Sequence, residues 1–227
     1  MSKAEVPIEL VRALNELGLS SASSLLGTPL TGGVSSDIWC IETEKGFVCA
    51  KRALSKLRVA ADWHAPVERN LFEARWLQVA RQASAACAPE LLGQHPELGV
   101  LVMQYLDPIH YRLWKQELHA GTADAHTAIA MGQVLSKIHS YAARNSQLAS
   151  EFPTDKIFFE IRLAPYLLAT AERHPKLAHA LEELVLQTQN NAKTLVHGDV
   201  SPKNILLGPQ GPVLLDAECA TWSDPAF

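Results

Sequence analysis

The spacing of apolar residues predicts a first half that mixes two helices with several strands. Residues 7–19 repeat apolar side chains every three or four positions, which indicates an amphipathic helix. Residues 38–43 and 47–52 are strand-like and flank a short connection that contains glycine, as in a β-hairpin. The helical period returns over residues 67–86, and residues 98–106 again favour a strand.

Helical patterns dominate from residue 108 onward. Residues 122–143, 157–173 and 175–190 are all predicted to be helical. Two hairpin-like strands near residues 205–215 are the only later β signal. The strands and helices therefore do not alternate along the chain, as they would in a doubly wound sheet.

This order of elements predicts an α+β protein with two lobes. Residues 1–106 are expected to form a small antiparallel sheet with a helix, and residues 107–227 a mainly helical lobe. The joint is expected in the segment that follows the strand at residues 98–106.

Composition narrows the class of protein. The 227 residues are 48% hydrophobic and 19% charged, which suffices for a sizeable core. The net charge of −4 comes with scattered lysines and arginines, which argues against a nucleic-acid partner. No apolar run approaches the roughly 20 residues of a membrane helix, and no signal-peptide core follows the N-terminus. Four cysteines without paired spacing indicate buried thiols, so we expect a cytoplasmic protein with no membrane partner.

The most informative stretch brings three oxygen-bearing side chains together. Asn204 enters one strand of the predicted hairpin, and the second strand delivers Asp216. The start of one antiparallel strand lies about 5 Å from the end of the other, so Asn204 and Asp216 share one rim of the hairpin. Asp199 is on the loop that enters this rim. Magnesium prefers such oxygen ligands. Each residue alone is as common in plain turns, but the combination at this spacing favours a cation site.

Three motifs in this region resemble the aminoglycoside phosphotransferase and choline kinase-like family. They are His197-Gly-Asp-Val-Ser-Pro-Lys-Asn204, Leu215-Asp-Ala-Glu218 and Asp224-Pro-Ala-Phe227. The resemblance implies a protein-kinase-like fold and Mg²⁺-dependent transfer of the γ-phosphate of ATP or GTP. The acceptor would be a hydroxyl of a small molecule such as an aminoglycoside, an amino alcohol or a sugar.

The same resemblance implies roles for three residues. The interval of five between Asp199 and Asn204 equals the interval in the kinase catalytic loop. Asp199 would then be the catalytic residue that accepts the proton of the acceptor hydroxyl. Asn204 and Asp216 would hold the metal. Lys203, between Asp199 and Asn204, either screens phosphate charge or is an ordinary solvated lysine.

The first half holds candidates for nucleotide binding. Lys51 ends a strand that resembles the V-A-I-K strand of kinases. Its acidic partner should lie on the following helix, where Glu68 and Glu73 both qualify. We favour Glu73 because its apolar neighbours would make an unpaired carboxylate costly. Gly33 and Ser35 lie in a glycine-containing segment that we expect to cover the phosphates, although it is not G-x-G-x-x-G.

The strand at residues 98–106 leads into a hinge, where main-chain groups around Gln104 and Leu106 are expected to meet the purine edge. Arg162 could reach a substrate, but packing along an apolar surface is the favoured interpretation. Trp222 lies where a substrate could stack. His139 is interpreted as a packed histidine. Six other histidines lack metal-ligand spacing and are interpreted as surface residues: His95, His110, His119, His126, His174 and His179.

The chain ends inside its third motif, where members of the family continue into further helices. We therefore expect an incomplete helical lobe, which leaves open a second hypothesis of a nucleotide-binding module that catalyses nothing. A third hypothesis is metal-assisted hydrolysis that uses His197 and Asp199. The mildly acidic net charge hints at cationic acceptors without deciding the question. The oligomeric state is open.

Overall fold

The computed structural model describes residues 3–30, 35–58 and 63–227. Within them, the first half forms a six-stranded antiparallel sheet with the order β1-β2-β3-β4-β6-β5. The strands are β1 (Ala4–Glu5), β2 (Leu26–Pro29), β3 (Ser36–Thr43), β4 (Gly46–Ala53), β5 (Leu91–His95) and β6 (Val100–Gln104). The predicted hairpin is β3 and β4, closed by a tight turn between Thr43 and Gly46, where Gly46 has a φ of 115°.

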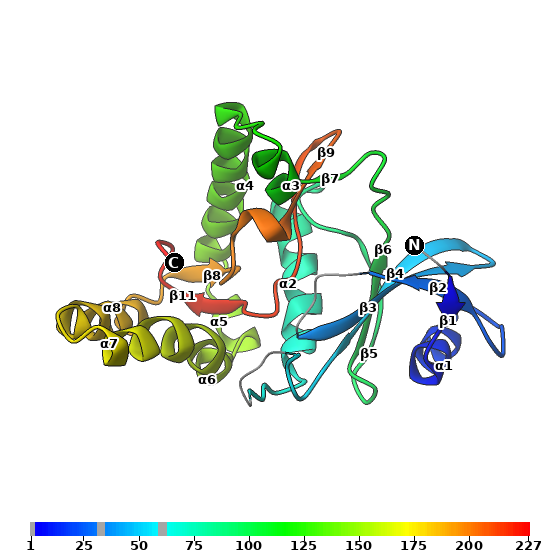
Figure 1. Ribbon diagram of the computed structural model, residues 1–227, viewed down its shortest axis with the longest axis horizontal. Helices are drawn as coiled ribbons and strands as arrows, with labels where there is room; N and C mark the ends of the chain where they lie inside the picture. The colour runs from blue at the N-terminus through cyan, green and yellow to red at the C-terminus, as the bar shows by residue number, and fades with distance from the viewer. Residues whose placement is uncertain (1–2, 31–34, 59–62) are drawn as a thin grey trace.

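Side-chain alternation in β4 and β6 gives the sheet two apolar faces. Helix α1 (Ile8–Glu16) packs on the face that carries Val48, Ala50, Val100 and Val102. Helix α2 (Arg69–Ala83) packs on the opposite face, against Cys49, Leu101 and Met103. Because side chains alternate along a strand, Lys51 shares the face of Cys49 and points toward α2. Figure 1 shows α2 between the sheet and helix α4.

The second half is mainly helical, in agreement with the sequence. Its helices are α3 (Trp114–His119), α4 (Ala125–Arg144), α5 (Leu148–Glu151), α6 (Asp155–Phe158), the π-helix η1 (Phe159–Leu168), α7 (Ala169–Arg173) and α8 (Ala178–Asn190). The sequence predicted one helix over residues 157–173. The structure divides it into α6, η1 and α7, with Pro165 inside η1. Proline has no N–H to donate, so it interrupts α-helical hydrogen bonding.

Short strands in this half correct the prediction that residues 205–215 hold the only later β signal. The predicted hairpin is β9 (Ile205–Gly208) and β10 (Gly211–Leu214). Strand β7 (Arg112–Leu113) pairs with β9, and β8 (Thr194–Val196) pairs with β11 (Thr221–Ser223). Strands of two or three residues are too short to show a period, and their partners lie far away in sequence.

One apolar core joins the two halves. It contains Cys49 and Leu101 from the sheet, Trp76 from α2, Ile138 from α4 and Leu214 from β10. The predicted boundary between residues 1–106 and 107–227 falls in the connection from β6 to β7 and stays a prediction. No helix of the described ranges is both long and apolar enough to cross a membrane.

Candidate active site

The β9–β10 hairpin carries the three predicted metal and catalytic residues to one rim. The 3₁₀ turn η2 (Pro202–Asn204) leads directly into β9. The amide of Leu215 donates to the carbonyl of Asn204 at 2.8 Å, so Asp216 leaves β10 next to Asn204. Asp199 lies in the loop between β8 and η2, and hydrogen bonds from Asn204 bring it to the same rim.

Asp199 has two carboxylate oxygens in different situations. Its Oδ2 accepts from the Asn204 amide at 2.9 Å and forms ion pairs with Lys203, at 3.0 Å, and with Arg162. No hydrogen bond to Oδ1 is found from the described residues. Burial alone would raise the pKa of Asp199, but Arg162 and Lys203 outweigh it and hold that pKa below its ordinary value. The side chain is therefore a fixed carboxylate with one oxygen left for a ligand.

Asn204 is buried, and its amide is oriented by Asp199. The Nδ2 atom donates to the Asp199 carbonyl at 3.0 Å as well as to its carboxylate. This use of the nitrogen leaves the amide oxygen as the atom available to a cation. The five-residue interval seen in the sequence is therefore also a hydrogen-bonded unit.

His197 holds the loop around Asp199 through hydrogen bonds to backbone groups. Its ring is buried and meets the Trp76 ring edge-on, with 4.8 Å between centroids. Nε2 lies 3.0 Å from the Leu215 carbonyl and must donate to it, while Nδ1 accepts from the Asp199 amide at 3.2 Å. Burial lowers the pKa of His197 to about 4. It is therefore a neutral group with both nitrogens in use, which disfavours the hydrolysis hypothesis.

Two left-handed residues shape the rim. Gly198 has a φ of 77°, and a Cβ there would lie 2.4 Å from the carbonyl oxygen of Cys219. Among the described residues, Asp216 is the only one other than glycine with a positive φ, at 63°. Such a conformation costs energy in a side-chain-bearing residue and is often found at functional sites.

The Asp216 carboxylate is held by Lys51. The Lys51 side chain is 2% exposed and pairs with both Asp216 and Glu73, the latter at 2.7 Å. Burial opposes its charge, but the two carboxylates raise the pKa of Lys51 above its ordinary value. Burial likewise works against ionisation of Asp216, yet Lys51 lowers its pKa. Glu68 is exposed at the start of α2, so the acid on Lys51 is Glu73.

Arg69 connects the segments around this ion-pair network. Its guanidinium is buried and uses all five N–H groups, at donor–acceptor distances of 2.6–3.1 Å. The acceptors are the carbonyl oxygens of Ser35, Leu54, Ala65 and Pro66 and the carboxylate of Glu218. These bonds tie the residue before β3 and the end of β4 to the loop after Asp216. Sequence reasoning did not single out Arg69.

Of the remaining residues predicted to bind the nucleotide, the structure describes Ser35, Gln104 and Leu106. Gly33 lies outside the described residues. Ser35 is buried, and its carbonyl accepts a hydrogen bond from Arg69. Gln104 ends β6 with an exposed side chain, and its backbone N–H donates to the Glu90 carbonyl at 2.8 Å. Leu106 is half-buried in the connection that follows.

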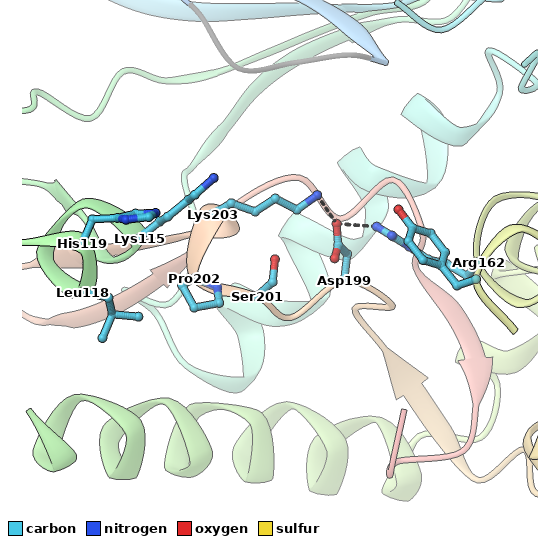
Figure 2. Close-up of a pocket in the computed structure, with 9 residues that line it drawn as sticks. Lys115, Leu118, His119, Arg162, Asp199, Ser201, Pro202 and Lys203 are labelled. Carbon is cyan, nitrogen blue, oxygen red and sulfur yellow. Dashed lines mark ion pairs between the residues drawn. The ribbon is translucent and has the colours of Figure 1, made fainter. Parts of the chain in front are cut away.

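A cavity of about 560 Å³ opens beside Asp199 (Figure 2). Helix α3 contributes Lys115, Leu118 and His119, η1 contributes Arg162 and Tyr166, and the loop around Asp199 completes the lining. Arg162, for which the sequence favoured a packing role, thus lines the cavity and pairs with the Asp199 carboxylate. The sequence analysis did not identify the α3 residues, because nothing in their local pattern shows that α3 lies beside the loop around Asp199.

Trp222 is not among the residues that line this cavity. It lies on β11 opposite Leu195 and packs against the shared core. Its packing role is therefore the one that the geometry supports.

Comparison with known proteins identifies the family. Residues 27–227 match the phosphotransferase enzyme family. The chain belongs to that family. The match covers most of the sheet, the β9–β10 hairpin and the cavity lining, and it confirms the resemblance that the three motifs carried.

Curated relatives of this phosphotransferase-family chain are distant. A protein of Klebsiella aerogenes named "Probable ketoamine kinase" is 25% identical over 67% of this chain and 56% of its own length. Methylthioribose kinase 1 of Oryza sativa subsp. japonica is 23% identical over 84% of this chain and 50% of its own length. The chain thus spans about half the length of these relatives.

Solved structures give the fold. A choline/ethanolamine kinase family protein from Mesorhizobium loti superposes with a TM-score of 0.54 at 15% identity, covering 96% of this chain and 67% of the other. Choline kinase from Cryptosporidium parvum gives 0.51 at 15% identity, covering 91% and 61%. The predicted α+β, two-lobed, protein-kinase-like fold is confirmed.

Proposed function

We propose that the protein transfers the γ-phosphate of ATP or GTP to a hydroxyl group of a small molecule, with Mg²⁺ as the cofactor. Asp199 carries this proposal. It lines the cavity, it is held as a carboxylate by Arg162 and Lys203, and its Oδ1 is left for an acceptor hydroxyl. A positioned carboxylate of this kind suits a general base.

Lys51 and its two acids support a nucleotide site beside Asp199. A buried ammonium between Glu73 and Asp216 is the arrangement that places a lysine on the phosphates of a nucleotide in kinases. We assign the nucleotide contacts to Gly33, Ser35, Lys51, Glu73, Gln104 and Leu106. The bonds from Arg69 would keep the segment at Ser35 in register with the loop after Asp216.

The oxygens at the rim suit Mg²⁺. Asn204 offers its amide oxygen because its nitrogen is used by Asp199, and Asp216 offers the carboxylate oxygen that Lys51 does not bind. The described residues contain no cluster of three or more His, Cys, Asp or Glu side chains that could hold a metal alone. Magnesium needs few protein ligands when phosphates supply the rest. When bound, it would neutralise charge on the phosphates.

The chemical step follows from these positions. The acceptor hydroxyl donates its proton to Oδ1 of Asp199 as its oxygen bonds to the γ-phosphorus. The bond between that phosphorus and the bridging oxygen breaks, and the nucleoside diphosphate leaves. Arg162 and Lys203 hold Asp199 in place during this step. Most of the acceleration would come from positioning and charge neutralisation.

The test measures Mg²⁺-dependent release of nucleoside diphosphate with a panel of aminoglycosides, amino alcohols, sugars and hydroxy acids. Asp199→Asn keeps the shape and the acceptor oxygen for Asn204, so it should fold normally and lose about 100-fold or more in kcat. Asp155→Asn, at an exposed position on α6, is the matched control and should keep wild-type rates. Wild-type turnover by Asp199→Asn, or no turnover by the wild type with any acceptor, would contradict the proposal.

A further inference from the structure

The cavity beside Asp199 is positively charged, although the chain as a whole has a net charge of −4. Among the described residues that line it, Lys115, Arg162 and Lys203 are cations and Asp199 is the one carboxylate. The lining therefore has a net charge of two positive when His119 is neutral. Screening limits charge effects in solution to about 8 Å, so the lining governs what the cavity attracts and the distant acidic residues do not.

Lys115 adds a positive charge that is not paired with any carboxylate of the described residues. Arg162 and Lys203 are both committed to Asp199. Within the described ranges, Lys115 has no ion-pair partner, and the neighbouring carboxylate on α3, Glu117, pairs with Arg112 at 2.9 Å. The Lys115 amino group is exposed at the cavity and free to meet a ligand.

The charges are spread along the cavity. Figure 2 shows Lys115 and His119 on the α3 side and Arg162 on the other side, with Asp199 between them. A volume of about 560 Å³ is in the range of small-molecule sites. A single acceptor can therefore place its hydroxyl at Asp199 and another group at the α3 end.

We propose that the acceptor carries an anionic group, a carboxylate or a phosphate, which binds Lys115 and His119 while the hydroxyl meets Asp199. This inference rests on the proposed function and specifies its substrate class. A cationic acceptor would face Lys115 without a compensating carboxylate at that end. The hint from net charge toward cationic acceptors is thereby reversed.

An anion at Lys115 could belong to the acceptor or to the nucleotide, so the test fills the nucleotide site first. Isothermal titration is done with Mg²⁺ and a non-hydrolysable ATP analogue present. The titrants are gluconate, sorbitol and glucamine, which share one six-carbon polyol skeleton and differ in charge at one end. We expect gluconate to bind at least tenfold more tightly than glucamine, with sorbitol between them.

Lys115→Gln should weaken gluconate binding about tenfold, because it removes a charge-assisted contact. It should leave sorbitol and the ATP analogue within twofold. Lys176→Gln, an exposed lysine outside the cavity lining, removes the same charge and should change none of the three.

Glucamine binding as tightly as gluconate, undetectable gluconate binding, or a Lys115→Gln effect confined to the ATP analogue would each overturn the inference. Failure of the analogue to bind the wild-type protein would instead count against the proposed function.

Discussion

At the scale of single residues, the site depends on which atoms of each side chain are hydrogen-bonded or ion-paired and which remain available to a ligand. Oδ2 of Asp199 contacts Arg162, Lys203 and Asn204, and Oδ1 remains available. Both ring nitrogens of His197 are hydrogen-bonded to backbone groups. Burial keeps His197 neutral, and the ion pairs with Arg162 and Lys203 keep Asp199 charged. Two predictions follow from the resulting pKa shifts.

The first prediction concerns the base. Arg162 helps to lower the pKa of Asp199, so Arg162→Gln should raise that pKa. A general base must be deprotonated, and the acid limb of the kcat/KM profile should therefore move to higher pH. Rates measured from pH 3 to pH 8, on protein shown to stay folded at each pH, test this. Arg75→Gln, which loses an ion pair with Glu151 outside the cavity lining, should leave the limb in place. An unmoved limb in Arg162→Gln would show that Arg162 does not act on the base.

The second prediction concerns stability. The pKa of His197 is about 4 in the folded protein and about 6.5 when unfolded. Between these values the unfolded chain binds more protons, so stability falls as pH falls. From pH 7 to pH 5 the loss from this group should be about 2 kcal/mol. Urea unfolding at both pH values measures it. His197→Gln should be less stable at pH 7 but lose less on acidification, and an equal loss would contradict the assignment.

At the scale of elements, the loop between β8 and β9 depends on close backbone packing. Gly198 packs against the Cys219 carbonyl in a left-handed conformation and lies between His197 and Asp199, whose backbone amide donates to the His197 ring. On the other side of the rim, Arg69 ties the loop after Asp216 to the sheet. Small backbone changes here should therefore displace the Asp199 carboxylate.

Gly198→Ala should show this coupling. Its new Cβ would meet the Cys219 carbonyl at 2.4 Å and adopt an unfavourable φ, so we expect a loss of at least about 2 kcal/mol and a much lower kcat. Gly132→Ala is the matched control. Gly132 lies in α4 with open space around its Cβ position, and alanine there should stabilise the helix by about 0.5–1 kcal/mol. Urea unfolding and steady-state rates measure both. Equal effects of the two changes would contradict this account of the loop.

At the scale of the whole molecule, local sequence patterns predict the parts that local contacts build. The β3–β4 hairpin, α2, α4 and the β9–β10 hairpin follow from apolar period and glycine turns. The acid on Lys51 was chosen from its apolar neighbours, and the structure places Glu73 there. The cavity lining from α3 and the Arg69 bonds to Ser35 and Glu218 depend on contacts between segments 34 to 149 residues apart, which no local pattern shows. The π-helix was missed because its geometry has no sequence period of its own.

In the proposed function, the residues at this rim have two separate roles. Asp199 would act on the acceptor, and Asp216, Asn204 and Lys51 would act on the metal-bound nucleotide. Titration of Mg²⁺–ATP into the wild-type protein, Asp199→Asn and Asp216→Asn tests this division directly. Asp216→Asn should bind about tenfold or more weakly because it loses a charged oxygen ligand, and Asp199→Asn should bind within about threefold of wild type. Unchanged affinity in Asp216→Asn, or an equal loss in both variants, would contradict it.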